Sequence, residues 1–207
     1  MLLIIDLEAT CWDKDKYPEL REKQEKEMET IEIGGTLLSP SNESGKFELV
    51  VVDSFSTFIK PIRNLILSDY CRNLTSITQE DVNGAPEFSQ ALPVFVRAVE
   101  RHLGGGSIQN IVWASWGNYD RNQLLRDCAY HKVEYPFGVH WNVKVAYSRN
   151  RGVKKGFGVW KALQQCDMEF EGVRHRGIDD TKNIARIVQK KLTEDYKRNI
   201  RGVISYK

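Results

Sequence analysis

The sequence predicts an α/β fold in which a mixed sheet is flanked by helices. Three features favour this fold: a short apolar run at the N-terminus, two β-rich segments separated by a turn, and helical patterns in the second half. The strands begin as a hairpin and are later mixed with helices, unlike the regular alternation of a doubly wound parallel sheet. We therefore expect a sheet that contains both parallel and antiparallel neighbours.

Length and composition indicate one soluble globular domain. The chain has 207 residues, enough for a sizeable core, and its 41% apolar and 28% charged residues are ordinary values. A formal net charge of +2 neither demands nor excludes nucleic-acid binding. We expect a single domain over residues 1–207, with a short C-terminal tail from about residue 195.

The sequence also favours a cytoplasmic location. Its four cysteines form no CxxC pair, which is typical of reduced thiols in a cytosolic protein. The apolar start is too short for a signal peptide, and no stretch approaches the roughly 20 apolar residues of a membrane span. No membrane partner is expected.

The first half of the chain contains three predicted strands. The apolar run Leu2–Leu7 is typical of a central strand. Thr30–Leu38 and Phe47–Ile59 are rich in β-branched and aromatic residues, and the turn-forming residues 39–45 separate them. These two segments predict an antiparallel hairpin, which Pro61 would end because proline cannot donate to a ladder.

Helices are predicted both before and after a fourth strand in the sequence, Ile108–Ser115. The charged segment Lys14–Glu27 could be a solvated loop or a frayed helix. A short helix is expected over 76–82 and another over 158–165. Two longer helices have buried stripes at helical spacing: Phe88, Leu92, Val96, Val99 and Leu103 in one, and Ile184, Ile187, Val188 and Leu192 in the other, which begins near Ile178.

The helix after the fourth strand is predicted from its cap. Asn118 is expected to cap its N-terminus. Leu124, Leu125 and Cys128 are expected to face inward from the same helix.

Two carboxylates at the end of the first strand suggest a cation site. Asp6 and Glu8 are two positions apart, so they point to the same face of a strand. Burying two unpaired anions together is costly, and carboxylate oxygens suit Mg²⁺ or Mn²⁺. A strand end that emerges into solvent is the alternative, and it is common for an isolated D-x-E.

Two later stretches add acids and a base. Asp120 falls in the first turn of a helix, where the helix dipole alone would also explain it. His175 lies five residues before Asp180. An imidazole with a pKa of about 6.5 can take a proton from water. His175 could equally be a surface histidine, as is expected for His102, His131 and His140. Asp179 or Asp180 could likewise be a plain helix cap.

Five segments carry a resemblance to a known family. In order they read DLEATCW, METIEIGG, NLTSITQEDV, WASWGNYDRNQL and HRGIDDTKNIARI. They resemble the DEDDh 3′–5′ exonucleases, in the branch that trims histone mRNA, ribosomal RNA and small interfering RNA, with KapD-like bacterial relatives. The resemblance covers about residues 1–190. It implies a ribonuclease H-like fold with a mixed five-stranded sheet.

The resemblance also implies a site with two divalent metal ions, Mg²⁺ or Mn²⁺. Asp6 would bridge both ions, and Glu8 and Asp180 would hold the one that carries the attacking water. Asp120 would act directly or through water, and His175 would be the general base. Two metals can supply nucleophile, charge neutralisation and leaving-group stabilisation for phosphodiester hydrolysis.

The implied substrate is a single-stranded RNA 3′ end, with DNA as a further option, and the implied product is a nucleoside 5′-monophosphate. Backbone groups around Glu8 and Ala9 would contact the terminal sugar, and His175 would also contact the substrate. Trp12 and Trp116 could stack on a base, or could simply pack against the sheet. The sequence names no protein partner.

Two other functions fit the same residues. One is a regulator that binds RNA ends or a partner with weak or no turnover, in the manner of a KapD-like inhibitor. The other is a two-metal phosphatase or endonuclease. The complete set of five candidate residues argues against an inactive protein.

Overall fold

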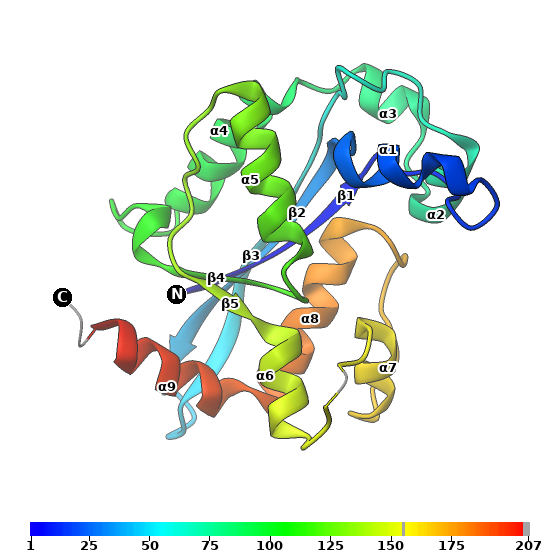
Figure 1. Cartoon of the computed structure of the whole chain (residues 1–207). Coiled ribbons are helices and arrows are strands. Elements are labelled where there is room, and N and C mark those ends of the chain that lie inside the picture. The colour runs from blue at the N-terminus through cyan, green and yellow to red at the C-terminus, as the bar shows by residue number, and fades with distance from the viewer. Residues whose placement is uncertain (155, 205–207) are drawn as a thin grey trace.

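The computed structural model describes residues 1–154 and 156–204, which form a sheet flanked by helices (Figure 1). The five strands have the spatial order β3-β2-β1-β4-β5. They are β1 (Leu2–Ala9), β2 (Thr30–Ser41), β3 (Glu48–Phe58), β4 (Val112–Ser115) and β5 (His140–Asn142). β2 is antiparallel to β1 and β3, whereas β4 is parallel to β1 and β5. This confirms the predicted mixed sheet and its hairpin.

Helices cover both faces of this sheet. The α-helices are α1 (Arg21–Lys26), α2 (Asp69–Thr75), α3 (Gln79–Asn83), α4 (Phe88–Glu100), α5 (Tyr119–His131), α6 (Val143–Asn150), α7 (Val159–Gln164), α8 (Gly177–Lys191) and α9 (Thr193–Ile204). Short 3₁₀ turns precede α1 (Pro18–Leu20) and β4 (Ile108–Asn110). α4 and α5 lie on one face of the sheet, and α6, α7, α8 and α9 lie on the other (Figure 1). Core residues of each set pack against the strands.

The alternation along β1 decides where its carboxylates point. Leu2 and Ile4 belong to the core on the α8 face, whereas Leu3, Ile5 and Leu7 belong to the core on the α4 face. Successive side chains of a strand point to opposite faces. The even-numbered acids that follow therefore lie on the face that α8 covers.

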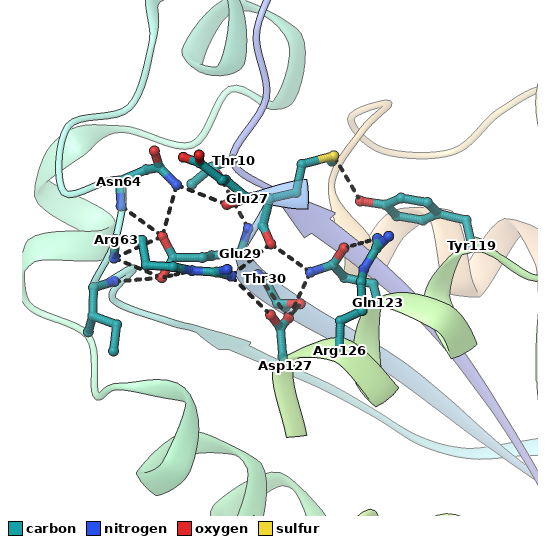
Figure 2. A network of polar contacts seen from close by, with 12 residues as sticks. Thr10, Glu27, Glu29, Thr30, Arg63, Asn64, Tyr119, Gln123, Arg126 and Asp127 are labelled. Carbon is teal, nitrogen blue, oxygen red and sulfur yellow. Dashed lines mark hydrogen bonds and ion pairs between the residues drawn. The ribbon is translucent and has the colours of Figure 1, made fainter. Parts of the chain in front are cut away.

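A buried polar network fastens α5 to the start of β2 (Figure 2). Asp127 Oδ2 accepts from the Thr30 hydroxyl at 2.6 Å and from Gln123 Nε2 at 3.0 Å. Glu29 accepts from the backbone N–H groups of residues 62–64. Arg63 lies between the two acids, 3.6 Å from Glu29 and 3.8 Å from Asp127. Because the network fixes α5, it also fixes the acid in the first turn of α5.

Two predicted elements have different bounds. The strand predicted over Ile108–Ser115 is wrong in its first half, which forms a 3₁₀ turn before β4. The helix predicted over 76–82 is α3, which starts later because Thr78 forms a capping box with Asp81. Ser76 instead ends α2 with a φ of 59°, and α2 itself was not predicted.

The cap and one inward residue predicted for α5 are also wrong. Leu124 and Cys128 are buried, but Leu125 is 40% exposed, because a step of one residue rotates a side chain off the buried face of a helix. Asn118 occupies the N-cap position without a side-chain cap bond. Its Oδ1 accepts from Asn142 Nδ2 at 2.8 Å instead, which ties α5 to β5.

The last two helices complete the core. In α8 the predicted stripe is buried, including Ile184, Ile187 and Val188 at 0% exposure, as is Leu192 beyond its end. Residues 195–204, predicted as part of a tail, lie within α9, where Tyr196 is 1% exposed, and the rest of the predicted tail lies outside the described residues. Across residues 1–154 and 156–204, no helix combines the length and the apolar character that crossing a membrane requires.

Candidate active site

Three carboxylates from two elements meet at the C-terminal half of β1. Asp6, Glu8 and Asp180 each offer an oxygen, and these oxygens lie within 4.8 Å of one another. Asp6 and Glu8 share the α8 face of β1, and Asp180 lies in the first turn of α8. The i, i+2 spacing and the packing of α8 on that face therefore create the cluster.

Asp120 reaches the same region from α5. It is 4% exposed, and its Oδ1 accepts from the backbone N–H of Leu7 at 3.1 Å. This bond locks the first turn of α5 to the middle of the strand that carries Asp6 and Glu8. The structure thus brings together acids that are more than a hundred residues apart in the chain.

His175 lies in the loop between α7 and α8 and faces the same space. Its φ of 59° is in the left-handed region, which turns the chain sharply before α8 begins. Burial lowers the pKa of His175 below its usual value, and the nearby charge of Arg174 lowers it further. The imidazole is therefore mostly neutral near pH 7, the form that accepts a proton.

These five side chains line one cavity of about 480 Å³. The other lining residues are Leu7, Ala9, Cys11, Gln24, Met28, Leu74, Trp116, Tyr119, Gly158, Val159, Trp160, Phe170 and Arg174. The volume falls within the range of about 300–1,000 Å³ typical of small-molecule sites. The cavity can therefore hold a group of about the size of one nucleotide.

The acids of the cluster resist ionisation in the absence of cations. Burial raises the pKa of Asp6 well above its usual range, and the neighbouring acids raise it further. Burial and then Asp180 raise the pKa of Glu8 to about 9. Burial also raises the pKa values of Asp120 and Asp180 to about 6. Bound cations would reverse this effect, because they favour the ionised carboxylates.

The residues present fit divalent metal ions. Asp180 Oδ2 is buried and finds no hydrogen-bond partner in the described part of the chain. A buried unpaired oxygen is costly, and a metal ligand bond would satisfy it. The donors are all carboxylate oxygens, which are the ligands that Mg²⁺ and Mn²⁺ prefer.

The predicted substrate-binding residues divide into two groups. Ala9 and Trp116 line the cavity, and the Trp116 indole donates to the Phe157 carbonyl at 2.7 Å. Trp12 lines a separate cavity of about 430 Å³, and Lys23 Nζ lies 4.6 Å from the centre of its ring. Stacking of either tryptophan on a base stays a prediction.

The expectation that His140 is a surface residue is wrong. Its Nε2 lies 2.9 Å from the Ser115 hydroxyl, and its ring lies 4.3 Å from that of Trp113. Burial, followed by the charge of Arg121, lowers the pKa of His140 to about 4. It therefore packs as a neutral side chain of β5 against Ser115 and Trp113 of β4.

Glu32, to which the sequence motifs assign no role, supports the loop that carries His175. Glu32 of β2 is 0% exposed and lies opposite Glu8 in the sheet. Its Oε2 accepts from Arg176 Nε at 3.2 Å and from the Gly177 N–H at 3.1 Å. A single charged residue inside the apolar stretch Thr30–Gly35 is the signal that could have identified it.

Comparisons with known proteins agree with this geometry. A family model described as Exonuclease (RNase_T) matches residues 3–188. The chain belongs to this exonuclease family. The solved nuclease domain of 3′hExo, described as a DEDDh family member bound to rAMP, superposes with a TM-score of 0.75 at 30% identity. That comparison covers 93% of this chain and 92% of the other. The fold is therefore the ribonuclease H-like fold of the DEDDh exonucleases.

Relatives of the exonuclease family are longer than this chain. The 3′-5′ exoribonuclease 1 of Homo sapiens is 30% identical, over 93% of this chain and 52% of its own length. The ERI1 exoribonuclease 2 of Danio rerio is 30% identical, over 93% of this chain and 35% of its own length. A solved complex described as 3′-end specific recognition of histone mRNA stem-loop by 3′-exonuclease has a TM-score of 0.72 at 28% identity, covering 93% of this chain and 81% of the other. The similarity therefore covers the nuclease domain and leaves out other parts of these proteins.

Proposed function

We propose that this chain is a metal-dependent exoribonuclease that removes nucleoside 5′-monophosphates from the 3′ end of single-stranded RNA. The observation that carries the proposal is the cluster of Asp6, Glu8 and Asp180, whose oxygens lie within 4.8 Å of one another. Asp120 and His175 line the same cavity. Membership in the exonuclease family supports hydrolysis of a phosphodiester at a chain end.

Each of these residues has a defined task in the proposal. Asp6, Glu8, Asp120 and Asp180 would hold two divalent ions, Mg²⁺ or Mn²⁺. Such ions polarise the phosphate and stabilise the oxygen that leaves. His175 takes the proton from the attacking water at an imidazole nitrogen, since its lowered pKa keeps it neutral near pH 7. The water oxygen forms a bond to phosphorus as the bond to the 3′ oxygen of the preceding nucleotide breaks.

RNA is the proposed substrate because of the named relatives. Those quoted above are called exoribonucleases, and the solved complexes are described with rAMP and with a histone mRNA stem-loop. A 2′-hydroxyl is the group that distinguishes RNA from DNA. Glu8 and Ala9 line the cavity, and in this proposal their backbone groups contact the terminal sugar.

An end-label assay tests the activity. The purified chain is incubated with 5′-labelled single-stranded RNA, and separately with DNA of the same sequence, in Mg²⁺, in Mn²⁺ and in chelator. We expect a ladder that shortens one nucleotide at a time, requires metal and is blocked by a 3′-phosphate.

Other outcomes separate the competing functions. Retention of RNA without cleavage would indicate a binding regulator. Internal cuts that ignore the 3′-phosphate would indicate an endonuclease. The Asp180→Asn variant is the matched control, because a contaminating nuclease would remain active in that preparation.

A further inference from the structure

The structure assigns Trp160 and Arg174 to a second nucleotide subsite at the rim of the catalytic cavity. We propose that the Arg174 guanidinium binds the phosphate on the 5′ side of the penultimate nucleotide, and that Trp160 stacks on the base of that nucleotide. This inference rests on the proposed exonuclease function and adds to it the means by which the enzyme holds RNA beyond the reacting nucleotide.

Arg174 is a cation in an acidic cavity and has no ion-pair partner among the described residues. In the part of the chain that the structure describes, it is the one arginine or lysine that lines this cavity. It is exposed, and no carboxylate of the described residues lies within ion-pair distance of it. Guanidinium groups bind phosphate well because their donors match two phosphate oxygens.

The second arginine of the same loop provides a contrast. Arg176 is two residues further on, and its Nε donates to the buried Glu32 at 3.2 Å. It also lies 5.1 Å from the centre of the Phe58 ring, away from the cavity lining. The two arginines on either side of His175 therefore differ: one supports the loop, and the other faces the space where substrate must pass.

Trp160 is exposed beside the Arg174 guanidinium. It is 46% exposed, whereas the core tryptophan Trp113 is 0% exposed. The Arg174 guanidinium lies 5.6 Å from the centre of the Trp160 ring. An exposed indole contributes little to the core, but a base stacks well on such a surface. The Trp116 indole donates to the Phe157 carbonyl, which fixes the chain just before α7.

In this proposal, two parts of the cavity lining contact different nucleotides of the RNA. One part lies near the end of β1, and the other is formed by α7 and the loop before α8. Cys11, which is 6% exposed, lines the cavity just beyond the end of β1. The part formed by α7 and the loop before α8 carries the exposed pair. The cavity takes about one nucleotide, so the rest of an RNA strand must leave across an exposed rim, and Trp160 and Arg174 supply aromatic and cationic contacts there.

Two substrates distinguish this subsite from the catalytic centre. The p-nitrophenyl ester of uridine 5′-monophosphate presents the terminal nucleotide and the scissile bond, with p-nitrophenol in place of the second nucleoside. A short single-stranded RNA presents both nucleotides. Both assays are run at pH 8, where His175 stays neutral even when the Arg174 charge is removed. We expect Arg174→Ala and Trp160→Ala each to raise KM for RNA by about tenfold and to leave kcat/KM for the ester within about twofold.

Conservative variants and binding measurements complete the test. Arg174→Lys and Trp160→Phe should recover most of the loss, and the control Arg101→Ala, which removes an exposed arginine outside the cavity, should change neither substrate. In chelator, the dissociation constant for labelled RNA should rise by about tenfold in the two alanine variants.

Several results would overturn the subsite. One is an equal loss on both substrates, which would place the pair at the reacting nucleotide. Another is unchanged KM and unchanged RNA binding. A wild-type protein that cleaves neither substrate would instead overturn the proposed activity, and this subsite with it.

Discussion

A Cβ atom on Gly34 would lie 2.0 Å from the carbonyl carbon of Gly177. The middle of β2 and the first turn of α8 thus touch backbone to backbone. A Cβ on Gly177 would in turn lie 2.9 Å from the Asp6 carbonyl oxygen. This close approach is what brings Asp180, three residues along α8, to the carboxylates of β1.

We expect Gly34→Ala to damage both fold and site. The new methyl group meets backbone that cannot rotate away, so we expect a loss of about 3 kcal/mol in the free energy of unfolding. Any folded fraction should show much weaker metal binding, because α8 must move outward. Urea denaturation checks the first effect. The control is Gly84→Ala, where the nearest atom is 3.8 Å from the added Cβ; equal stability of the two variants would contradict this account.

Replacing Glu32 by alanine should loosen the loop that carries His175. The side chain accepts from Ser56, Arg176 and the Gly177 N–H. After the cost of desolvating the buried carboxylate, these bonds contribute about 2–3 kcal/mol to the free energy of unfolding. We expect that loss of stability and a fall of about 10- to 100-fold in kcat. Glu32→Gln should be milder, since its amide can still accept from the loop and donate to Ser56. The idea fails if both variants match the wild type in denaturation and in turnover.

Asp180→Asn should abolish turnover and make the metal-free protein more stable. The substitution removes a proposed metal ligand and also removes one charge from a repulsive cluster. We expect turnover to fall below detection and the free energy of unfolding in chelator near pH 8 to rise by about 1 kcal/mol. Glu134→Gln, an exposed acid outside the cavity, is the control and should change neither quantity. A less stable Asp180→Asn protein would show that the acids do not repel one another.

His175→Ala should slow the chemical step without affecting the metal ions. We expect kcat to fall by about 10²–10⁴. At saturating Mn²⁺ the wild-type rate should rise with pH and then level off as His175 loses its proton, at a pH below the usual range of an imidazole because the pKa of His175 is lowered, and the variant should lose this rise. The increase in Tm that Mn²⁺ produces should be the same in both proteins. Wild-type turnover in the variant across pH 6–9 would rule out His175 as the base.

Metal should stabilise the protein more at alkaline than at acidic pH. The folded-state pKa values of Asp120 and Asp180, about 6, and of Glu8, about 9, lie above those of an unfolded chain. Such groups favour the fold while protonated, and their contribution is lost as pH rises from about 4 through these values. Metal binds the ionised acids and offsets the loss. Thermal melts with Mg²⁺, and with NaCl at equal ionic strength, should give a larger Mg²⁺-specific rise in Tm at pH 8 than at pH 5.

The sequence by itself determined the residues of the candidate site and the class of the fold. Local patterns are sufficient for this, because alternation along β1 places Asp6 and Glu8 on one face whatever the rest of the chain does. The apolar stripe of α8 likewise predicts its buried side. The motifs then identify the family through residue types that carry chemistry.

The tertiary structure decided which of these residues meet and what surrounds them. No local pattern indicates that Gly34 touches Gly177, that Glu32 holds the histidine loop or that Arg174 faces the cavity while Arg176 does not. The same applies to Leu125 and Trp12, whose surroundings are supplied by segments far away in the chain. Burial, charge coupling and backbone contact depend on those distant segments, so they follow only once the strands and helices have packed.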